Sequence, residues 1–315
     1  MDYVMADLRS YLGVPLSARL LRQLEITTPW IIEDLLPPMG RLILAAPPKV
    51  GKSLLAQQLA HCIALGEPFL GMENHSGPLR VHYIDYEVGP VFTKARLEAM
   101  APLYPDADEN IFITMFPPGE PEDAMRKVKD VGLFIIDPIS AIRMEDENNN
   151  AQVRRRLDDI ARVARDEYGA AVLVVHHMRK QSRDPENNWY MGLGEARGAG
   201  AFYDWVDGGM ALRELDRTTR TFELRFGTRG SETPDPLVIV RDPETLTYAP
   251  KHAIMGGPAL SREDFIKAHE EICAEMGKDY NKAELVRRLG ERFKRGRSTI
   301  YRLFQQAGID MEEER

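Results

Sequence analysis

The sequence predicts an α/β fold with a mostly parallel central sheet, followed by a small all-α unit at the C-terminus. Short apolar runs alternate with helical patterns from about residue 30 to 248, as expected for strands that are covered on both faces. Such alternation is typical of a parallel sheet with helices on both sides, in which ligands bind at the carboxyl ends of the strands. The predicted strands are 42–46, 81–85, 111–114, 133–137, 171–176, 208–213, 221–226 and 237–241.

The chain of 315 residues divides into four predicted parts. Residues 1–28 carry leucines near helical spacing and lie outside the predicted core, where they could dock on that core or on a neighbouring subunit. The core spans 29–250, and a linker that contains glycine and proline spans 251–259. Residues 260–315 then form a separate helical module.

A phosphate-binding loop follows the first predicted strand. Strand, loop, Gly-Lys-Ser and helix follow one another in the Walker A order, in which backbone N–H groups and a helix N-terminus bind phosphate. We expect Lys52 to reach the β- and γ-phosphates and the Ser53 hydroxyl to contact Mg²⁺. Ala46 stands where the pattern has its first glycine, which leaves the backbone donors intact. The expected nucleotide-binding residues are Ala46, Pro47, Pro48, Lys49, Val50, Gly51, Lys52, Ser53 and Leu54.

Two other predicted strands end in acidic residues. The strand 133–137 has the Walker B pattern, an apolar run that ends in Asp137, and this carboxylate is expected to hold Mg²⁺ through water. Glu87 follows the strand 81–85, where a carboxylate could orient and deprotonate the attacking water. Asp85 is the second choice for this base, or a group that supports it. An ordinary surface glutamate after a strand remains the alternative explanation for Glu87.

Two histidines and two arginines lie at the ends of later strands. His176 and His177 could sense the γ-phosphate, although a hydrogen-bonded core histidine is the alternative for one of them. They make a poor metal pair, because adjacent strand residues point to opposite faces. Arg225 and Arg229 could reach the nucleotide of a neighbouring subunit as arginine fingers, unless they only lie on a solvated face of the sheet.

In this order the motifs resemble the RecA-fold ATPases of the RepA type, which are hexameric plasmid replicative helicases, and their AAA-annotated relatives. The resemblance covers roughly residues 29–248 and implies a RecA-like P-loop NTPase core with ATP and Mg²⁺ as cofactors. It also implies a homo-oligomer, expected to be a hexamer. Glu87 would be the catalytic base, His177 or His176 would couple the phosphate state to the DNA side, and both arginines would act in trans.

The resemblance further implies two loops that face the channel of the ring, near 142–152 and 179–200. The second loop combines aromatic residues and glycines with four basic residues that could contact single-stranded DNA, namely Arg179, Lys180, Arg183 and Arg197. The first loop is acidic, which does not suit contact with DNA. A flexible, solvated loop is an equally good interpretation of both segments.

The C-terminal module has the pattern of a helix-turn-helix. Helices are predicted over 281–293 and 299–308, around a glycine-containing turn. The window 282–302 holds eight Lys or Arg residues and two Glu residues, within a protein of net charge −8. We expect duplex DNA to bind here, although a helical protein-interaction module is the alternative. The expected DNA contacts are Arg295, Arg297, Ser298, Thr299, Tyr301 and Arg302, and Arg288 and Arg292 are expected to meet phosphates.

Composition excludes several classes of protein. The net charge of −8 excludes a uniformly basic surface, and no apolar stretch approaches the roughly 20 residues that span a bilayer. The N-terminus lacks the basic and apolar regions of a signal peptide. Cys62 and Cys273 are expected to be free thiols in a reducing cytoplasm, rather than a disulfide or a metal site. We therefore expect a cytoplasmic protein without a membrane partner.

Three functions fit these patterns. The first is a ring-forming, ATP-hydrolysing DNA motor of the RepA helicase type that acts in DNA replication or repair. The second is a DNA-bound regulatory or recombination-mediator ATPase without unwinding activity, and the third is a repressor whose oligomeric state depends on nucleotide. The complete set of hydrolytic motifs favours the first two, whereas the acidic first loop favours the second and third.

Overall fold

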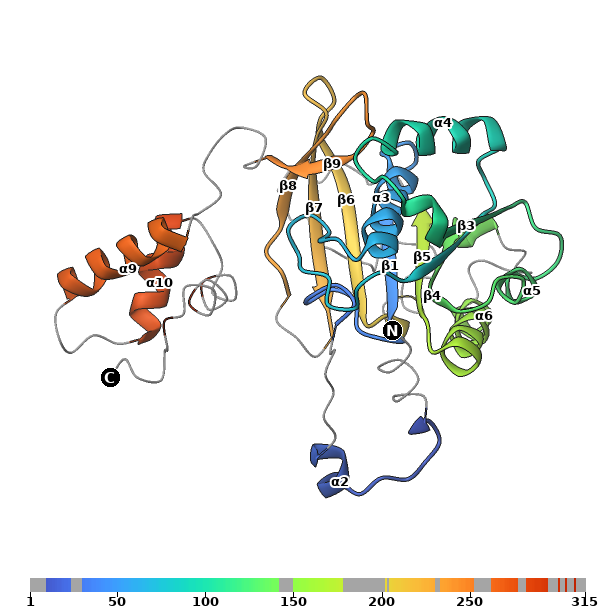
Figure 1. The fold of residues 1–315 in the computed structure, drawn as a ribbon, viewed down its shortest axis with the longest axis horizontal. Helices are drawn as coiled ribbons and strands as arrows, with labels where there is room; N and C mark the ends of the chain where they lie inside the picture. The colour runs from blue at the N-terminus through green and yellow to red at the C-terminus, as the bar shows by residue number, and fades with distance from the viewer. Residues whose placement is uncertain are drawn as a thin grey trace.

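The fold is a central sheet with helices on both faces (Figure 1). The computed structural model describes residues 10–23, 30–141, 150–177, 202, 204–229, 233–251, 262–276, 282–293, 300, 304 and 309. No helix within these ranges is long and apolar enough to cross a membrane.

The sheet of the described core has nine strands in the order β3-β2-β4-β5-β1-β6-β7-β8-β9. Neighbours from β3 to β6 pair in parallel, whereas β7, β8 and β9 continue the sheet with antiparallel pairing. The sheet is therefore mostly parallel, as predicted. The strands are β1 (Arg41–Ala46), β2 (Arg80–Asp85), β3 (Ile111–Met115), β4 (Val131–Asp137), β5 (Ala171–His177), β6 (Gly208–Asp216), β7 (Thr221–Thr228), β8 (Leu237–Arg241) and β9 (Tyr248–Pro250).

All eight predicted strands are present, and the sequence interpretation missed only the short β9 among the strands of the described residues. The α-helix over Asn150–Arg162 continues as a π-helix over Val163–Tyr168, which ends at Gly169. The α-helices are α2 (Ala18–Gln23), α3 (Lys52–Leu65), α4 (Pro90–Met100), α5 (Pro121–Met125), α6 (Asn150–Arg162), α9 (Arg262–Met276) and α10 (Lys282–Phe293).

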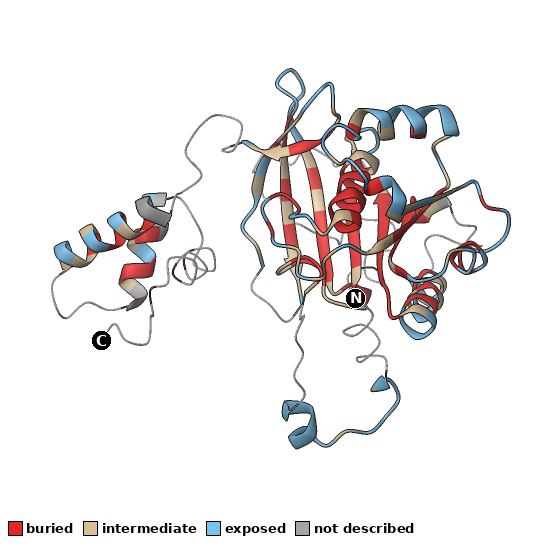
Figure 2. Cartoon of the chain, viewed as in Figure 1, coloured by how far each residue is buried: buried red, intermediate tan, exposed pale blue. Residues whose placement is uncertain are grey.

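The core forms two apolar layers, one on each face of the sheet. Alternate residues of each strand point to opposite faces, so that Leu42 and Leu44 of β1 pack on the side of α3, whereas Ile43 packs on the side of α5 and α6. Figure 2 shows that the central strands and α3 are almost entirely buried. Continuous apolar strands are therefore explained by helices on both faces, as the sequence predicted.

The register of the parallel strands brings the motif residues to one edge of the sheet. Ala46 at the end of β1 lies opposite His177 at the end of β5, and Asp85 at the end of β2 lies opposite Asp137 at the end of β4. These four strands are neighbours in the order β2-β4-β5-β1. The carboxyl edge of the sheet therefore gathers residues that are up to 131 positions apart in the chain.

The C-terminal helices α9 and α10 have an apolar cluster of their own. Phe265 of α9 packs edge-on against Phe304, with ring centroids 5.1 Å apart, and Leu285 and Leu289 of α10 join the same cluster. At the other end of the chain, α2 has no buried residue, and Leu21 in it is 55% exposed.

Candidate active site

The phosphate-binding loop connects β1 to α3 at the carboxyl edge of the sheet. Lys49 and Gly51 within it have positive φ angles of 64° and 109°, which turn the chain sharply before the helix. Gly51 is the N-cap of α3 and has no side-chain capping bond. The first N–H groups of α3 are therefore available to an anion, as in other phosphate sites at helix N-termini.

Strand β9 is hydrogen-bonded to this loop and to α3. The Tyr248 hydroxyl donates a hydrogen bond to the Gly51 carbonyl oxygen over 3.2 Å. The Gln58 side chain of α3 pairs with both the N–H and the carbonyl of Tyr248, at 2.7 and 2.8 Å. These bonds join positions 190 residues apart, which is why Gln58 and Tyr248 carry no recognisable signal in the sequence.

Replacing Gly51 with alanine should damage the loop. An added Cβ atom would overlap the Tyr248 hydroxyl, and φ at this position is +109°. We expect the unfolding temperature to fall by roughly 5 °C, because such backbone strain costs about 1–3 kcal/mol. Gly89→Ala is the matched control, since its Cβ would meet no atom within 4 Å and its φ is −77°. Equal thermal stability of the two variants would contradict this picture of the loop.

Lys52, His177 and Glu87 form a chain of contacts beside the loop. The Lys52 Nζ lies 3.0 Å from the His177 Nδ1, and the His177 Nε2 lies 3.3 Å from the Glu87 Oε2. Because an ammonium group only donates, Nδ1 accepts, and the imidazole hydrogen is on Nε2 and points to Glu87. Burial lowers the pKa of Lys52, and the charges of Asp137 and Glu87 partly oppose this shift.

Asp137 lies almost fully buried at the end of β4, with 2% of its surface exposed. Its Oδ2 accepts a hydrogen bond from the Tyr83 hydroxyl of β2. Burial raises the pKa of Asp137, and the hydrogen bond from Tyr83 and the nearby Ser53 hydroxyl oppose this shift. Burial also raises the pKa of Tyr83 well above its ordinary value, so the phenol keeps its proton and donates.

Ser53 and Asp137 thus lie together, as the two motifs require. The Asp137 Oδ1 is buried and has no hydrogen-bond partner among the described residues. A hydroxyl and a carboxylate oxygen are ligands that suit Mg²⁺, which keeps several of its waters when it binds to proteins. The residues therefore fit a magnesium ion that is shared with a nucleotide phosphate.

Asp85 shapes the turn that presents Glu87. Its Oδ1 accepts hydrogen bonds from the backbone N–H groups of Glu87 and Val88, at 2.9 and 2.8 Å. Its Oδ2 accepts a hydrogen bond from the Thr93 hydroxyl at 3.3 Å. Both carboxylate oxygens are thus occupied, so the geometry favours the supporting role for Asp85 over that of a base.

The two histidines lie on opposite sides of β5. His177 contacts Lys52 and Glu87, whereas His176 is buried against Phe202, with ring centroids 4.4 Å apart. Burial lowers the pKa of His176 to about 4. Within the described part of the chain, no group of three or more His, Cys, Asp or Glu side chains could hold a metal ion.

Arg225 and Arg229 lie at different levels of the sheet. Through the pairing of β7 with β6 and of β6 with β1, Arg225 is level with Ala45, close to the phosphate loop. Thr228 is level with Leu42, near the amino end of β1, and Arg229 follows it. In the isolated chain, Arg225 pairs with Glu223 at 3.0 Å. The Arg229 guanidinium donates to a backbone carbonyl at 3.0 Å.

The residues expected to contact DNA lie outside the described ranges, namely Arg179, Lys180, Arg183, Arg197, Arg295, Arg297, Ser298, Thr299, Tyr301 and Arg302. Two other basic residues of the C-terminal module are described. Arg288 pairs with Glu284 at 3.0 Å, and Arg292 pairs with Glu271 at 2.5 Å. Acidic neighbours therefore balance part of the positive charge of α10.

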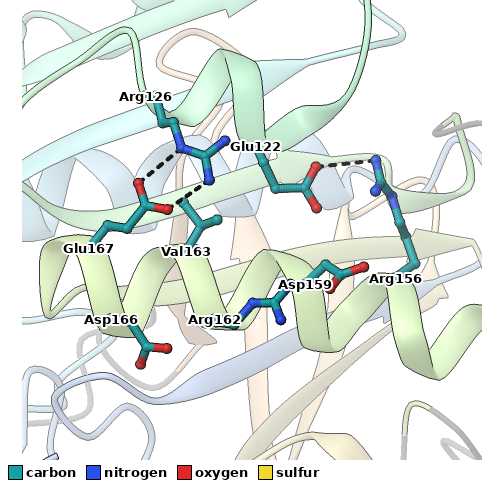
Figure 3. Close-up of a pocket in the computed structure, with 8 residues that line it drawn as sticks. All are labelled: Glu122, Arg126, Arg156, Asp159, Arg162, Val163, Asp166 and Glu167. Carbon is teal, nitrogen blue, oxygen red and sulfur yellow. Dashed lines mark hydrogen bonds and ion pairs between the residues drawn. The ribbon is translucent and has the colours of Figure 1, made fainter.

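A polar pocket of about 450 Å³ lies away from the phosphate loop, on α5, α6 and the π-helix. Figure 3 shows Arg126 facing Glu167 and Arg156 facing Glu122 across this pocket. The first pair makes two hydrogen bonds, at 2.9 and 2.7 Å, and the second is 3.2 Å apart. The charges of these residues pair with one another, so the pocket presents no defined ligand chemistry.

Comparisons with known proteins found a matching family and similar solved structures. A family model described as an AAA domain (AAA_25) matches residues 15–183. The solved ATPase domain of G40P is similar at 15% identity with a TM-score of 0.50, over 67% of this chain and 84% of that chain. The KaiC-like protein PH0186 from Pyrococcus horikoshii OT3 is similar at 14% identity with a TM-score of 0.49, over 70% and 93% of the two chains. A comparison with curated proteins gave no match.

The matched residues include the phosphate loop, the Walker B strand and both histidines, and they make up more than half of the chain. The similarity to the G40P domain extends the agreement to the three-dimensional arrangement of the core. The chain therefore belongs to the AAA domain family and is a P-loop ATPase with a RecA-like core.

Proposed function

We propose that the protein hydrolyses ATP at the carboxyl edge of its sheet. In this proposal the protein is a ring-forming DNA motor, and ATP hydrolysis drives it. The observation that carries the ATPase proposal is the chain of contacts from Lys52 through His177 to Glu87, at 3.0 and 3.3 Å, beside the phosphate loop. It joins a phosphate ligand, a phosphate sensor and a catalytic base in one hydrogen-bonded unit.

In the proposed reaction, the backbone N–H groups at the start of α3 and the Lys52 ammonium bind the phosphates. Ser53 and Asp137 hold Mg²⁺, which neutralises the charge that develops on the phosphate oxygens. Glu87 orients the attacking water and accepts its proton, because water is a weak nucleophile on its own. The turn built on Asp85 keeps the Glu87 backbone in place for this step.

His177 is suited to report the state of the nucleotide. Its Nδ1 accepts from Lys52 in the structure, so a lysine that turns to the phosphates leaves this nitrogen without its partner. His177 directly precedes the segment 178–200 of the sequence, which holds the four basic residues proposed to contact single-stranded DNA. A rearrangement of His177 would thus act on the start of that segment.

We further propose that the protein works as a homo-oligomer, in the form of a hexamer, in which Arg225 approaches the nucleotide of the adjacent subunit. An arginine supplied in trans stabilises the charge of the transferring phosphoryl group. Arg225 suits this role better than Arg229, because it is level with the phosphate-loop end of β1.

The second candidate is a DNA-bound regulatory or recombination-mediator ATPase that does not unwind DNA. The acidic residues within 142–152 favour it over the motor, because they do not suit a channel that grips DNA.

Turnover of ATP by the purified protein, with and without single-stranded and duplex DNA, tests the proposal. A motor should show turnover that single strands stimulate, together with strand displacement. Stimulated turnover without strand displacement would favour the mediator. An ATP turnover rate that DNA does not change would contradict a DNA-dependent role.

Deleting residues 258–315 should weaken duplex binding and leave basal ATP hydrolysis unchanged. The helices α9 and α10 have their own apolar cluster, whose buried residues all lie between Phe265 and Phe304. Titration of labelled duplex DNA and basal turnover would be measured on both chains. Loss of basal turnover would instead show that this part supports the core or an interface between subunits.

A further inference from the structure

A buried tyrosine lies directly beside the Walker B carboxylate. Tyr83 is in the middle of β2, is 2% exposed, and packs in the apolar layer on the side of α3. Its strand pairs in parallel with β4, and its hydroxyl donates a hydrogen bond to the Asp137 Oδ2. An apolar side chain of similar size would fill the same space, so the hydroxyl needs an explanation other than packing.

The hydrogen bond makes the two oxygens of Asp137 unequal. Oδ2 is occupied by Tyr83, whereas Oδ1 is buried without a hydrogen-bond partner within the described residues. A buried, unpartnered carboxylate oxygen is costly, and such costs are tolerated where a ligand completes the site. Ser53, the residue expected to share Mg²⁺ with Asp137, lies within hydrogen-bonding reach of the same carboxylate.

We propose that Tyr83 is a positioning residue that orients the Asp137 carboxylate, so that Oδ1 is presented to a magnesium-bound water. The inference rests on the proposed function, because it requires that this site binds ATP with Mg²⁺. Tyr83 does not contact the nucleotide and acts only through Asp137. Its contribution should therefore be visible in the magnesium dependence of nucleotide binding.

The test is Tyr83→Phe in the full chain, with binding of a fluorescent ATP analogue measured in excess Mg²⁺ and in excess EDTA. A hydrogen bond to a charged group changes an equilibrium constant by roughly tenfold or more. The ratio of analogue affinity in Mg²⁺ to affinity in EDTA should be about tenfold smaller in the variant than in the unaltered protein. Binding in EDTA should stay as in the unaltered protein, because the phosphate loop is untouched.

Tyr168→Phe is the matched control. The Tyr168 hydroxyl also makes one hydrogen bond, to the Met125 carbonyl at 3.1 Å, but it lies in the opposite apolar layer. Its removal should leave the magnesium dependence unchanged. A double-mutant cycle with Asp137→Asn adds a second readout, because Tyr83→Phe should have no further effect on magnesium dependence once the carboxylate is absent.

Unchanged magnesium tightening in Tyr83→Phe would overturn the inference and leave the proposed function intact. The same loss in the Asp137→Asn background would also overturn it, since Tyr83 would then act by another route. Failure of the unaltered protein to bind the analogue in Mg²⁺ would instead contradict the proposed function. If Tyr83→Phe does not fold, Tyr83→Met, which also lacks the hydroxyl and adapts to irregular space, takes its place in the same measurements.

Discussion

Lys52→Ala should reduce ATP turnover at least about 100-fold, because it removes the cation that stabilises charge on the transferring phosphoryl group. Lys52 is 5% exposed, and its ammonium contacts His177 at 3.0 Å in the structure. Truncation relieves the burial of a charge, so the fold should survive. Released phosphate would be measured at saturating ATP, together with binding of a fluorescent ATP analogue, which should weaken as well.

Lys129→Ala is the control for Lys52→Ala. Lys129 is an exposed lysine that precedes β4, at the amino edge of the sheet and far from the phosphate loop. Its loss should leave turnover as it is. Turnover of Lys52→Ala within a few-fold of the control would place the reaction elsewhere and remove the phosphate loop from the mechanism.

Glu87→Gln should separate binding of ATP from its hydrolysis. The amide keeps the size of the side chain but cannot accept the proton of the attacking water, so turnover should fall about 100-fold or more. Nucleotide affinity should change little, because Glu87 is not a phosphate ligand in the proposed site. Pre-equilibrium binding and single-turnover hydrolysis would be measured on the same preparation.

Glu109→Gln controls for the loss of one carboxylate charge. Glu109 is exposed in the 3₁₀ turn before β3, which places it at the amino edge of the sheet. Normal turnover in Glu87→Gln would assign the base to another group, whereas a parallel loss of binding would point to a structural role of the turn that Asp85 holds.

Several strands could be predicted because they are continuous apolar runs in the sequence, such as β1, β4 and β5. Helices on both faces bury these runs, so the local composition and the tertiary environment agree. Strand β9 escaped prediction because its three residues, Tyr248–Pro250, have no apolar run. The side chain of Gln58, 190 residues earlier, holds β9 in place through hydrogen bonds with the N–H and the carbonyl of Tyr248.

The residues of the candidate site were also predicted individually, because the Walker patterns are local in sequence. The contacts between these residues were not predicted. The parallel register places His177 opposite Ala46, and therefore next to Lys52, while His176 faces the other apolar layer. The same register shows that Arg225 and Arg229 are not equivalent, since their levels on the sheet differ.

The sequence by itself determined the fold class, the strands that compose the sheet and the motifs of a P-loop ATPase, because periodicity and short motifs are properties of neighbouring residues. Only the tertiary structure decided which histidine contacts Lys52, that Asp85 supports a turn, and that Tyr83 is hydrogen-bonded to Asp137. Pairing between strands that are distant in the chain sets these contacts, and no local pattern encodes it.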